Sequence, residues 1–328
     1  MTGIDGGIQL EASRLARIRT YSAHLARLPV REAHIVQLGR GELAMKSLRV
    51  FGRDAIVIRF TIAPLLTGHH VADPEWIGFM MPLSWEGDYR FNGQLARPGS
   101  VFLTSSPDGY FNIGKKRETL MFAVRRSVFV SAYCALAGVL PETVSLSDQQ
   151  IVLDEVSARR LQALFETVIA VARSDGSNGT DATIDLLVET DLIAAVAGFL
   201  SPSLSASQEV APSGVWRNPA EIVRRSEVAL SASPDQMLGL SDLCQAAGVG
   251  VTRLSECFHE IYGVSPGQYL KQARLTNVRQ WLLDEEDRPR SVKLAARTYG
   301  FRNNGRFAKY YFEMFGEMPS ETLARTAE

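Results

Sequence analysis

Basic side chains gather in one stretch near the C-terminal end of this 328-residue chain. From Arg288 to Phe312 there is no aspartate or glutamate, so the positive charge is not neutralised locally. The basic residues of this stretch are Arg288, Arg290, Lys293, Arg297, Arg302, Arg306 and Lys309. Cations at this density can neutralise the phosphates of a nucleic acid and release its counterions. We therefore predict a polyanionic ligand here, although the whole chain has a net charge of −1.

The residues around these cations predict two helices joined by a tight turn. Apolar residues between Val292 and Tyr299 have helical spacing, and Gly300 can adopt the positive φ that ends a helix. Asn303 can cap a second helix, which Pro319 prevents from continuing. Such a helix-turn-helix can place its second helix in the major groove of DNA. The alternative is a solvated pair of helices within a larger helical domain.

A second copy of this pattern lies about fifty residues upstream, from Leu240 to Gly263. It contains a short apolar helix, a turn at Gly248 and another helix with one apolar face. Between the two copies, Pro266 to Leu283 predicts a helix that begins at its proline. A helix of about 18 residues is roughly 27 Å long. Two units on one such helix can enter successive major grooves, which lie about 34 Å apart.

The sequence from Ser241 to Leu323 resembles the DNA-binding domain of AraC/XylS-type transcription regulators. The motifs that carry the resemblance are Gly-Val-Ser-Pro at 263–266, Arg-Leu in the linking helix, Gly-Phe in the second turn and Phe-Gly-x-x-Pro at 315–319. The second unit is most similar to the XylS and benzoate-regulator branch. This resemblance implies a cupin-like sensor domain at the N-terminal end, homodimerisation and activation of transcription by RNA polymerase.

The resemblance also implies which side chains contact DNA. In the first recognition helix, at about 251–260, the family commonly has arginine where this chain has Thr252 and Glu256. In the second, at about 303–315, Arg306 suits guanine and Asn304 suits adenine. Lys293 is expected to contact a phosphate. The complete set of expected DNA-binding residues is Thr252, Arg253, Ser255, Glu256, Arg290, Lys293, Arg302, Asn304, Arg306 and Lys309.

From Val30 to about Arg125 the pattern changes to short apolar runs that are separated by turn residues. This pattern is typical of a small β-barrel or sandwich, and the mouth of a barrel can hold one small ligand. The segment from Gly93 to Leu103 resembles the cupin-like sensor domain of the same family. The expected strands include Ala55–Ala63, Trp76–Leu83, Tyr89–Leu95, Val101–Thr104 and Thr119–Val124, with turns at 91–93, 97–100 and 107–109.

The expected fold class is α+β, with a cupin-like barrel, flanking helices and an all-α DNA-binding domain that contains two helix-turn-helix units joined by a long helix. Helices are expected at 11–28, 126–137, 154–173 and 181–200. The expected organisation is an N-terminal helix at 1–29, a cupin-like effector-sensing domain at 30–130, a helical dimerisation subdomain at 131–200, a linker at 201–217 and the DNA-binding domain at 218–328.

The residue types give little indication of an enzyme active site or a metal site. His69 and His70 are adjacent, so on a strand they point to opposite faces and cannot form a His-x-His pair of metal ligands. We expect both to be surface or loop residues. The three cysteines form no Cys-x-x-Cys motif, which favours buried thiols in a reducing cytoplasm. We predict no enzymatic activity, no metal and no cofactor.

We therefore predict a cytoplasmic, sequence-specific transcription regulator, an activator that is controlled by a small organic effector in the barrel. The resemblance to this branch implies that the effector is an aromatic or other small organic acid. Arg59 or Arg90 could form an ion pair with its carboxylate. Alternatively, both arginines form ion pairs at the surface. The expected partners are double-stranded DNA, the effector, RNA polymerase and a second copy of the chain, without a membrane. Two alternatives are a ligand-independent DNA-binding regulator and a cupin-type enzyme fused to a DNA-binding domain.

Overall fold

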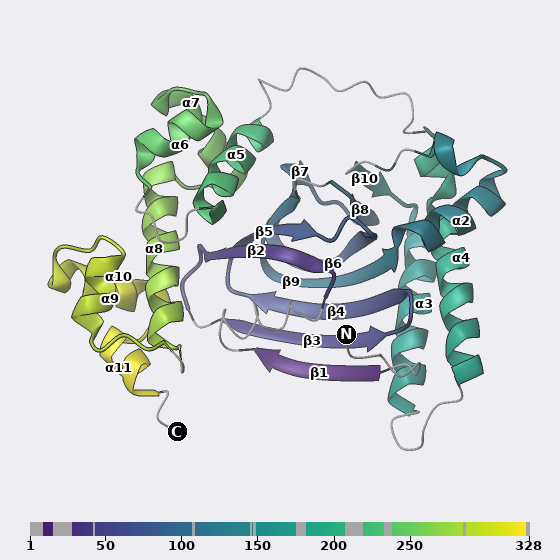
Figure 1. Ribbon diagram of the computed structural model, residues 1–328, viewed down its shortest axis with the longest axis horizontal. Coiled ribbons are helices and arrows are strands. Elements are labelled where there is room, and N and C mark those ends of the chain that lie inside the picture. The colour runs from purple at the N-terminus through teal and green to yellow at the C-terminus, as the bar shows by residue number, and fades with distance from the viewer. Residues whose placement is uncertain are drawn as a thin grey trace.

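The strands of the N-terminal half form one antiparallel sheet in the computed structural model (Figure 1). They are β1 (Gln9–Leu15), β2 (Val30–Gln37), β3 (Ala44–Phe51), β4 (Ala55–Ala63), β5 (Leu66–Ala72), β6 (Trp76–Phe91), β7 (Gln94–Leu95), β8 (Ser100–Thr104), β9 (Tyr110–Arg125) and β10 (Gln149–Val152). The structure describes residues 9–15, 28–41, 43–106, 109–144, 146, 149–174, 182–206, 219–232, 238–284 and 287–325.

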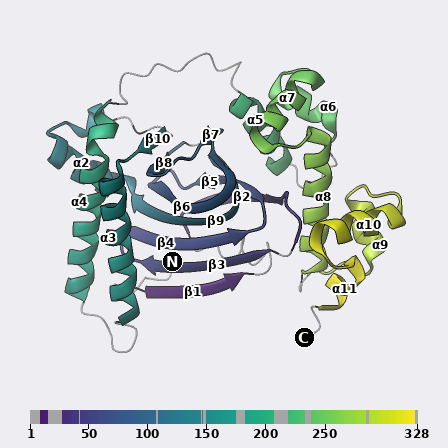
Figure 2. The ribbon, with the colours of Figure 1, turned by 180° about the vertical axis from the view of Figure 1, so that it is seen from behind.

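The remaining elements are helical and lie mostly after the sheet. They are α2 (Arg126–Ala137), the 3-10 turn η1 (Pro141–Thr143), α3 (Glu155–Ser174), α4 (Ala182–Ala206), α5 (Pro219–Ala232), α6 (Leu240–Ala247), α7 (Val251–Tyr262), α8 (Pro266–Leu282), α9 (Val292–Thr298), α10 (Asn304–Phe315) and α11 (Pro319–Ala324). Helices α2 to α4 and helices α5 to α11 lie on opposite sides of the sheet-rich part (Figures 1 and 2). The predicted α+β fold, with a sheet-rich N-terminal part and a helical C-terminal part, is confirmed.

Strand β9 organises the sheet because it pairs with different neighbours along its length. The strand order is β1-β3-β4-β9-β6-β8-β10, while β5 joins β2 to β9 and β7 pairs with β6. Tyr110–Gly114 pairs with β5, whereas 117–124 pairs with β4. Lys116, between the two segments, has a φ of 42°. Such an irregularity bends a strand and lets it serve two neighbours.

The predicted strands agree with the structure only in part. Ala55–Ala63 has the predicted bounds, and β9 extends well beyond the predicted Thr119–Val124. The separate strands predicted at Trp76–Leu83 and Tyr89–Leu95 are wrong, because β6 runs from Trp76 to Phe91 and a turn divides it from β7 at Gln94–Leu95. Asn92 and Gly93 form a two-residue hairpin turn with φ values of 46° and 78°, as the Asn-Gly pair favours. Of the turn predicted at 107–109, residues 107 and 108 lie outside the described part of the chain.

The predicted N-terminal helix is wrong where the structure describes it. Gln9–Leu15 is strand β1, which pairs with β3 in seven consecutive register positions from Gln9↔Phe51 to Leu15↔Met45. Without β1, the free side of β3 would be an unpaired sheet edge, and this tertiary pairing outweighs the helical spacing of the sequence. The rest of the predicted helix, residues 16–27, falls outside the described residues.

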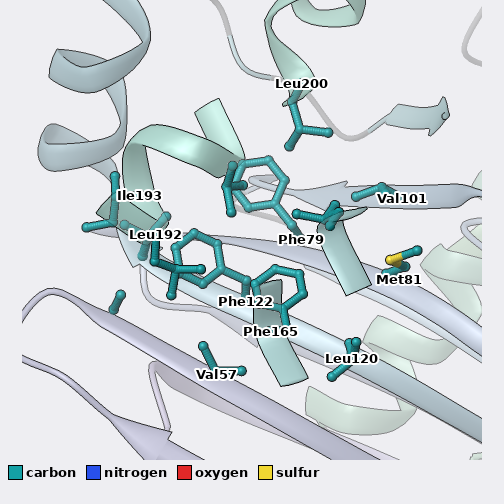
Figure 3. Close-up of a cluster of buried hydrophobic side chains, with 14 of the residues drawn as sticks. Val57, Phe79, Met81, Val101, Leu120, Phe122, Phe165, Leu192, Ile193 and Leu200 are labelled. Carbon is teal, nitrogen blue, oxygen red and sulfur yellow. The ribbon is translucent and has the colours of Figure 1, made fainter. Parts of the chain in front are cut away.

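Helices α2 to α4 begin and end close to the predicted residues, but α4 continues to Ala206. The predicted linker at 201–217 therefore begins inside a helix, and residues 207–218 are not described. The Ser- and Pro-rich composition predicts a linker, but Leu200 and Leu204 are buried in the core. This packing continues the helix past Pro202. Figure 3 shows part of this core, in which Phe79 and Phe122 of the sheet contact Leu192 and neighbouring residues.

None of the helices that the structure describes is both long enough and apolar enough to span a lipid bilayer.

Candidate nucleic-acid interface

The second helix-turn-helix unit, α9 and α10, has two predicted features, the turn at Gly300 and the Asn303 cap, and one cap that was not predicted, Ser291. Ser291 caps α9 by accepting a hydrogen bond from the Leu294 amide at 3.2 Å. Gly300 in the turn has a φ of 83°, which a residue with a Cβ rarely adopts. Asn303 Oδ1 accepts a hydrogen bond from the Arg306 amide at 2.9 Å and so caps α10. The predicted cap and turn are confirmed.

The first unit, α6 and α7, repeats this arrangement with a glycine-rich turn. Gly248 has a φ of 68° at the end of α6, and Gly250 precedes α7. The linking helix α8 begins at Pro266, as predicted, and Ser265 caps it by accepting a hydrogen bond from the Gln268 amide. Both units therefore pack on one continuous helix, the first near its start and the second near its end (Figure 1).

Each unit has its own apolar core against α8. Phe258 and Tyr269 are buried in the first unit, and Phe307, Tyr311 and Phe315 are buried in the second. These buried aromatic residues therefore support the fold, whereas Phe312 of α10 is 52% exposed.

An ion pair that the sequence does not predict anchors α8 to the end of the second unit. Arg279 Nη2 lies 2.9 Å from Glu317 Oε1, and the two side chains are only 7% and 9% exposed. Thr322, which follows in α11, donates to Glu317 Oε1 at 2.8 Å and accepts from Tyr311 at 2.9 Å. Arg279 also lies over the ring of Phe315, 4.6 Å from its centroid. This network fixes the second unit on the linking helix.

The residues expected to contact DNA lie at the surface of the two units. In the second unit and the segment before it, Arg290, Lys293, Arg302, Asn304, Arg306 and Lys309 are exposed. In the first unit, Thr252 and Glu256 are exposed, while Arg253 and Ser255 are half-buried. The structure therefore leaves eight of the ten expected side chains accessible and the other two partly so.

The two recognition helices differ in charge. In α7, Arg253 Nη1 lies 3.1 Å from Glu256 Oε2, so the arginine is neutralised by its own helix, and the exposed Glu260 adds a negative charge. In α10, Arg306 forms no ion pair with any residue that the structure describes, and Lys309 lies 3.9 Å from Glu313 at the far end. Positive charge is therefore concentrated on the second unit.

Arg274 of the linking helix makes a contact within the domain. Its Nη2 donates a hydrogen bond to the Leu238 carbonyl at 3.1 Å, which ties the segment before α6 to α8.

A cavity inside the sheet carries charged groups that sequence reasoning missed. It has an empty volume of about 500 Å³, and Arg49, Arg117, His70, Tyr110 and Asn112 are among its lining residues. The two arginines are only 1% and 5% exposed. The burial of Arg117 has a weak sequence signal, because Lys116 and Glu118 flank it, whereas Arg49 lies between the apolar residues Leu48 and Val50.

Hydrogen bonds hold the guanidinium of Arg117 at the wall of this cavity. Its Nη1 donates to the carbonyls of Leu66 and Gly114 at 3.0 and 2.8 Å, and its Nη2 donates to Asn112 Oδ1 at 2.8 Å. The guanidinium also lies over the ring of Tyr89. The orientation of Arg117 is thereby fixed before any ligand enters.

Arg59 and Arg90, which the sequence offered for a carboxylate, form ion pairs instead. Arg59 pairs with Glu118 at 2.7 Å and Arg90 pairs with Asp88 at 3.1 Å. Neither lines the cavity. Their alternative role as ion-paired residues is the one that the structure supports.

The histidine pair was placed wrongly at the surface. His69 and His70 are both buried in β5, because that strand is covered by the interior of the sheet-rich part on one face and by α5 and α8 on the other. Burial lowers the pKa of His70 to about 3. Within the described part of the chain, no cluster of three or more histidine, cysteine, aspartate or glutamate side chains could hold a metal ion.

The C-terminal sequence is similar to known regulators. Residues 243–325 match the family described as a helix-turn-helix domain. XylDLEGF operon transcriptional activator 3 of Pseudomonas putida is 37% identical over 90 residues, which are 27% of this chain and 27% of that protein. The match thus spans about a quarter of the length of this curated relative.

Two solved structures extend the comparison. A probable AraC family transcriptional regulator from Rhodopseudomonas palustris CGA009 is 34% identical, covers 33% of this chain and 98% of its own chain, and has a TM-score of 0.31. The AraC-like transcriptional activator CuxR is 14% identical over 78% of this chain and 90% of its own, with a TM-score of 0.43. On the sequence identity of its helix-turn-helix units, the chain belongs to the AraC/XylS family of transcription regulators.

Proposed function

We propose that this protein is a sequence-specific DNA-binding regulator whose second helix-turn-helix unit provides most of the affinity. The observation that supports this division is the charge difference between the recognition helices. Arg302 and Arg306 are exposed at the start of α10, whereas Arg253 of α7 is paired with Glu256. Because binding to phosphates depends on net positive charge, α10 and the segment before it form the stronger electrostatic contact.

In this proposal base recognition is divided between the two units. Arg306 and Asn304 lie in the first turn of α10, where side chains reach base edges, and they suit guanine and adenine. Lys309 lies one turn further along, while Arg290 and Lys293 precede α10 and contact phosphates. In the first unit, Thr252 and Ser255 offer hydroxyl groups, and Glu256 accepts a hydrogen bond from cytosine once Arg253 turns to the DNA.

Selection of bound sequences from a randomised DNA pool tests this function directly, with the full-length protein. We expect a motif with two conserved blocks about one helical turn apart. Recovery of no motif above the input pool would contradict sequence-specific binding. In the same experiment with Arg306→Ala, we expect the selected DNA to lose its sequence preference in the block that α10 contacts and to keep it in the other block.

We further infer that the protein activates transcription in the cytoplasm, with RNA polymerase as its partner. The support is that the similar protein of Pseudomonas putida is a transcriptional activator. A reporter gene placed behind the selected motif measures the sign of the effect. Expression that falls when the protein is present would assign repression instead.

We propose that the effector is a small organic acid that binds in the cavity lined by Arg49, Arg117 and His70. Two buried guanidinium groups line this cavity, and each can donate a charge-assisted hydrogen bond to a carboxylate. Tyr110 and the apolar residues Ile58, Phe60, Met80 and Met121 line the same cavity, so the acid is expected to carry an apolar or aromatic body.

A thermal-shift series with benzoate and related acids tests this effector. A ligand at about 100 times its Kd stabilises the folded protein by about 2.7 kcal/mol, which gives a measurable rise in Tm. Arg117→Gln should abolish the rise, whereas the matched control Arg59→Gln, outside the cavity, should retain it. No shift with any acid would favour a regulator that binds DNA without a ligand.

We also propose that a second copy of the chain binds to the helical subdomain of α2, α3 and α4. Its supporting observation is the exposure of Leu136 and Leu140 at the end of α2, which are 56% and 68% exposed. A dimer contact would cover these side chains. Sedimentation of the full chain and of Leu140→Asp measures the oligomeric state, and an unchanged dimer in the variant would place the contact elsewhere.

A further inference from the structure

Strands β2, β5 and the first segment of β9 form a wall with two different faces. The register places His34 and Phe111 opposite His69 on its two neighbouring strands, so these three side chains share one face. Ala33 and Tyr110 lie opposite His70 and share the other face. We call this three-stranded part of the sheet the dividing wall.

The inner face of the dividing wall belongs to the sensor interior. Tyr110 is part of the same apolar cluster as Ile35 and Leu66, and its ring stacks on His70 with centroids 5.1 Å apart. His70 lines the cavity with the two arginines. Gly68 lies beside it, and a Cβ at Gly68 would come within 2.5 Å of the His70 ring. A ligand in the cavity therefore contacts the dividing wall at His70.

The outer face of the dividing wall belongs to the core of the first helix-turn-helix unit. Val36 and Phe111 share one apolar cluster with residues of α5, α7 and α8. The ring of Phe111 packs edge-on against Tyr262 of α7, with centroids 6.3 Å apart. Gln272 Nε2 of α8 donates a hydrogen bond to the Leu38 carbonyl at 3.0 Å, just beyond β2.

A buried carboxylate lies at the centre of this contact. Glu227 of α5 is fully buried and accepts a hydrogen bond from the Tyr269 hydroxyl at 2.7 Å. Burial raises its pKa, and helix α5, which carries it, packs against strand β5 of the dividing wall. A displacement of β5 therefore changes the surroundings of a polar group that water cannot reach.

We propose that the dividing wall couples the cavity to the first helix-turn-helix unit, because His70 on its inner face lines the cavity and Phe111 on its outer face packs against Tyr262 of α7. A ligand that displaces His70 moves β5, and the outer face of the wall carries the displacement to α5 and α7. The identity of the ligand rests on the proposed function, whereas the coupling rests on the wall alone. The second unit meets the sensor through a different contact, from the Gly41 amide to the Met314 carbonyl at 2.9 Å.

Two glycine substitutions in the same sheet test this coupling without any ligand or DNA. Gly68→Ala places a methyl group against His70, and Gly78→Ala places one 2.5 Å from Thr104 Oγ1 in β8. Both glycines are buried in the sheet, but only Gly68 lies in the dividing wall. Amide hydrogen exchange in the full-length chain then reports the opening of each helix.

We expect Gly68→Ala to raise the exchange rates of amides in α5 and α7 about tenfold and Gly78→Ala to leave them within about twofold of the original rates. Comparable exchange in the two variants, or no change in α5 and α7 for Gly68→Ala, would refute the coupling. Because no ligand is present, failure here is distinct from failure of the effector proposal, which the thermal-shift series detects.

Glu227→Gln tests the same coupling from the helical side of the dividing wall. It remains usable if Gly68→Ala does not fold. It replaces the buried carboxyl group by an amide and keeps an acceptor for the Tyr269 hydroxyl. Coupling is reciprocal, so exchange in β5 should rise while exchange in β8 and β10, at the far end of the sheet, stays unchanged. Unchanged exchange in β5 would overturn the proposal.

Discussion

Replacing Arg306 by alanine should remove base recognition without disturbing the fold. The Arg306 side chain is exposed and makes no ion pair with a described residue, while its backbone amide, which the substitution keeps, donates to the Asn303 cap. Surface substitutions of this kind change the free energy of unfolding by less than about 0.5 kcal/mol. A lost contact to guanine costs about 1–3 kcal/mol. The affinity for the preferred DNA should therefore fall by about 5- to 150-fold.

Fluorescence anisotropy with labelled duplexes measures this loss. The preferred sequence, the three variants at the guanine contacted by Arg306, and random DNA should be titrated at several salt concentrations. Arg306→Ala should bring the four duplexes that differ at this position to nearly equal affinity. Lys293→Ala is the matched control, because an exposed phosphate contact should weaken all duplexes alike and lower the salt slope by about one. Equal losses on preferred and random DNA for Arg306→Ala would refute its assignment to a base.

Three further predictions concern the stability of the folded chain, measured by urea unfolding. Glu317→Ala leaves the guanidinium of Arg279 buried without its carboxylate and should cost about 3–5 kcal/mol; a loss below 1 kcal/mol would mean that water or another group replaces it. Asn303→Ala should cost about 1 kcal/mol through loss of the helix cap, whereas Asn303→Asp should retain most of it. Burial, together with the charge of His69, lowers the pKa of His34 to about 4 and that of His70 to about 3. Both folded-state pKa values lie below the unfolded value of 6.5, so the unfolded chain binds the extra protons as the pH falls. The free energy of unfolding should therefore fall between pH 6.5 and 4, by about 1.4 kcal/mol per pH unit for each histidine. A free energy of unfolding that stays constant over that range would contradict the burial of both histidines as neutral groups.

The helix-turn-helix units could be predicted closely because local residues determine their boundaries. Gly248, Gly300, Asn303 and Pro266 each act on their own turn or helix end, so their effect does not depend on distant parts of the chain. The outward direction of Arg306 follows from the helical period once those ends are known. Which bases these side chains contact depends on the DNA and stays a prediction.

The sheet-rich N-terminal part was less predictable because its important contacts join distant segments. Arg117 follows two lysines and precedes Glu118, a pattern typical of an exposed strand, yet the bend at Lys116 turns its side chain inward. His69 is buried by a helix more than 150 residues later in the sequence, which no local pattern indicates. The strand at 9–15 likewise depends on the free edge of β3.

The continuous linking helix α8 has a consequence for the DNA that this protein recognises. Since no turn interrupts Pro266–Leu282, and Arg279 is locked to Glu317, the two recognition helices are held in one relative orientation. One base pair inserted between their subsites moves one subsite by about 3.4 Å and rotates it by about 35° around the DNA axis. Helix α8 itself, as described from Pro266 to Leu282, contains no break that could follow that rotation. The spacer between the two blocks should therefore tolerate changes of base but not changes of length.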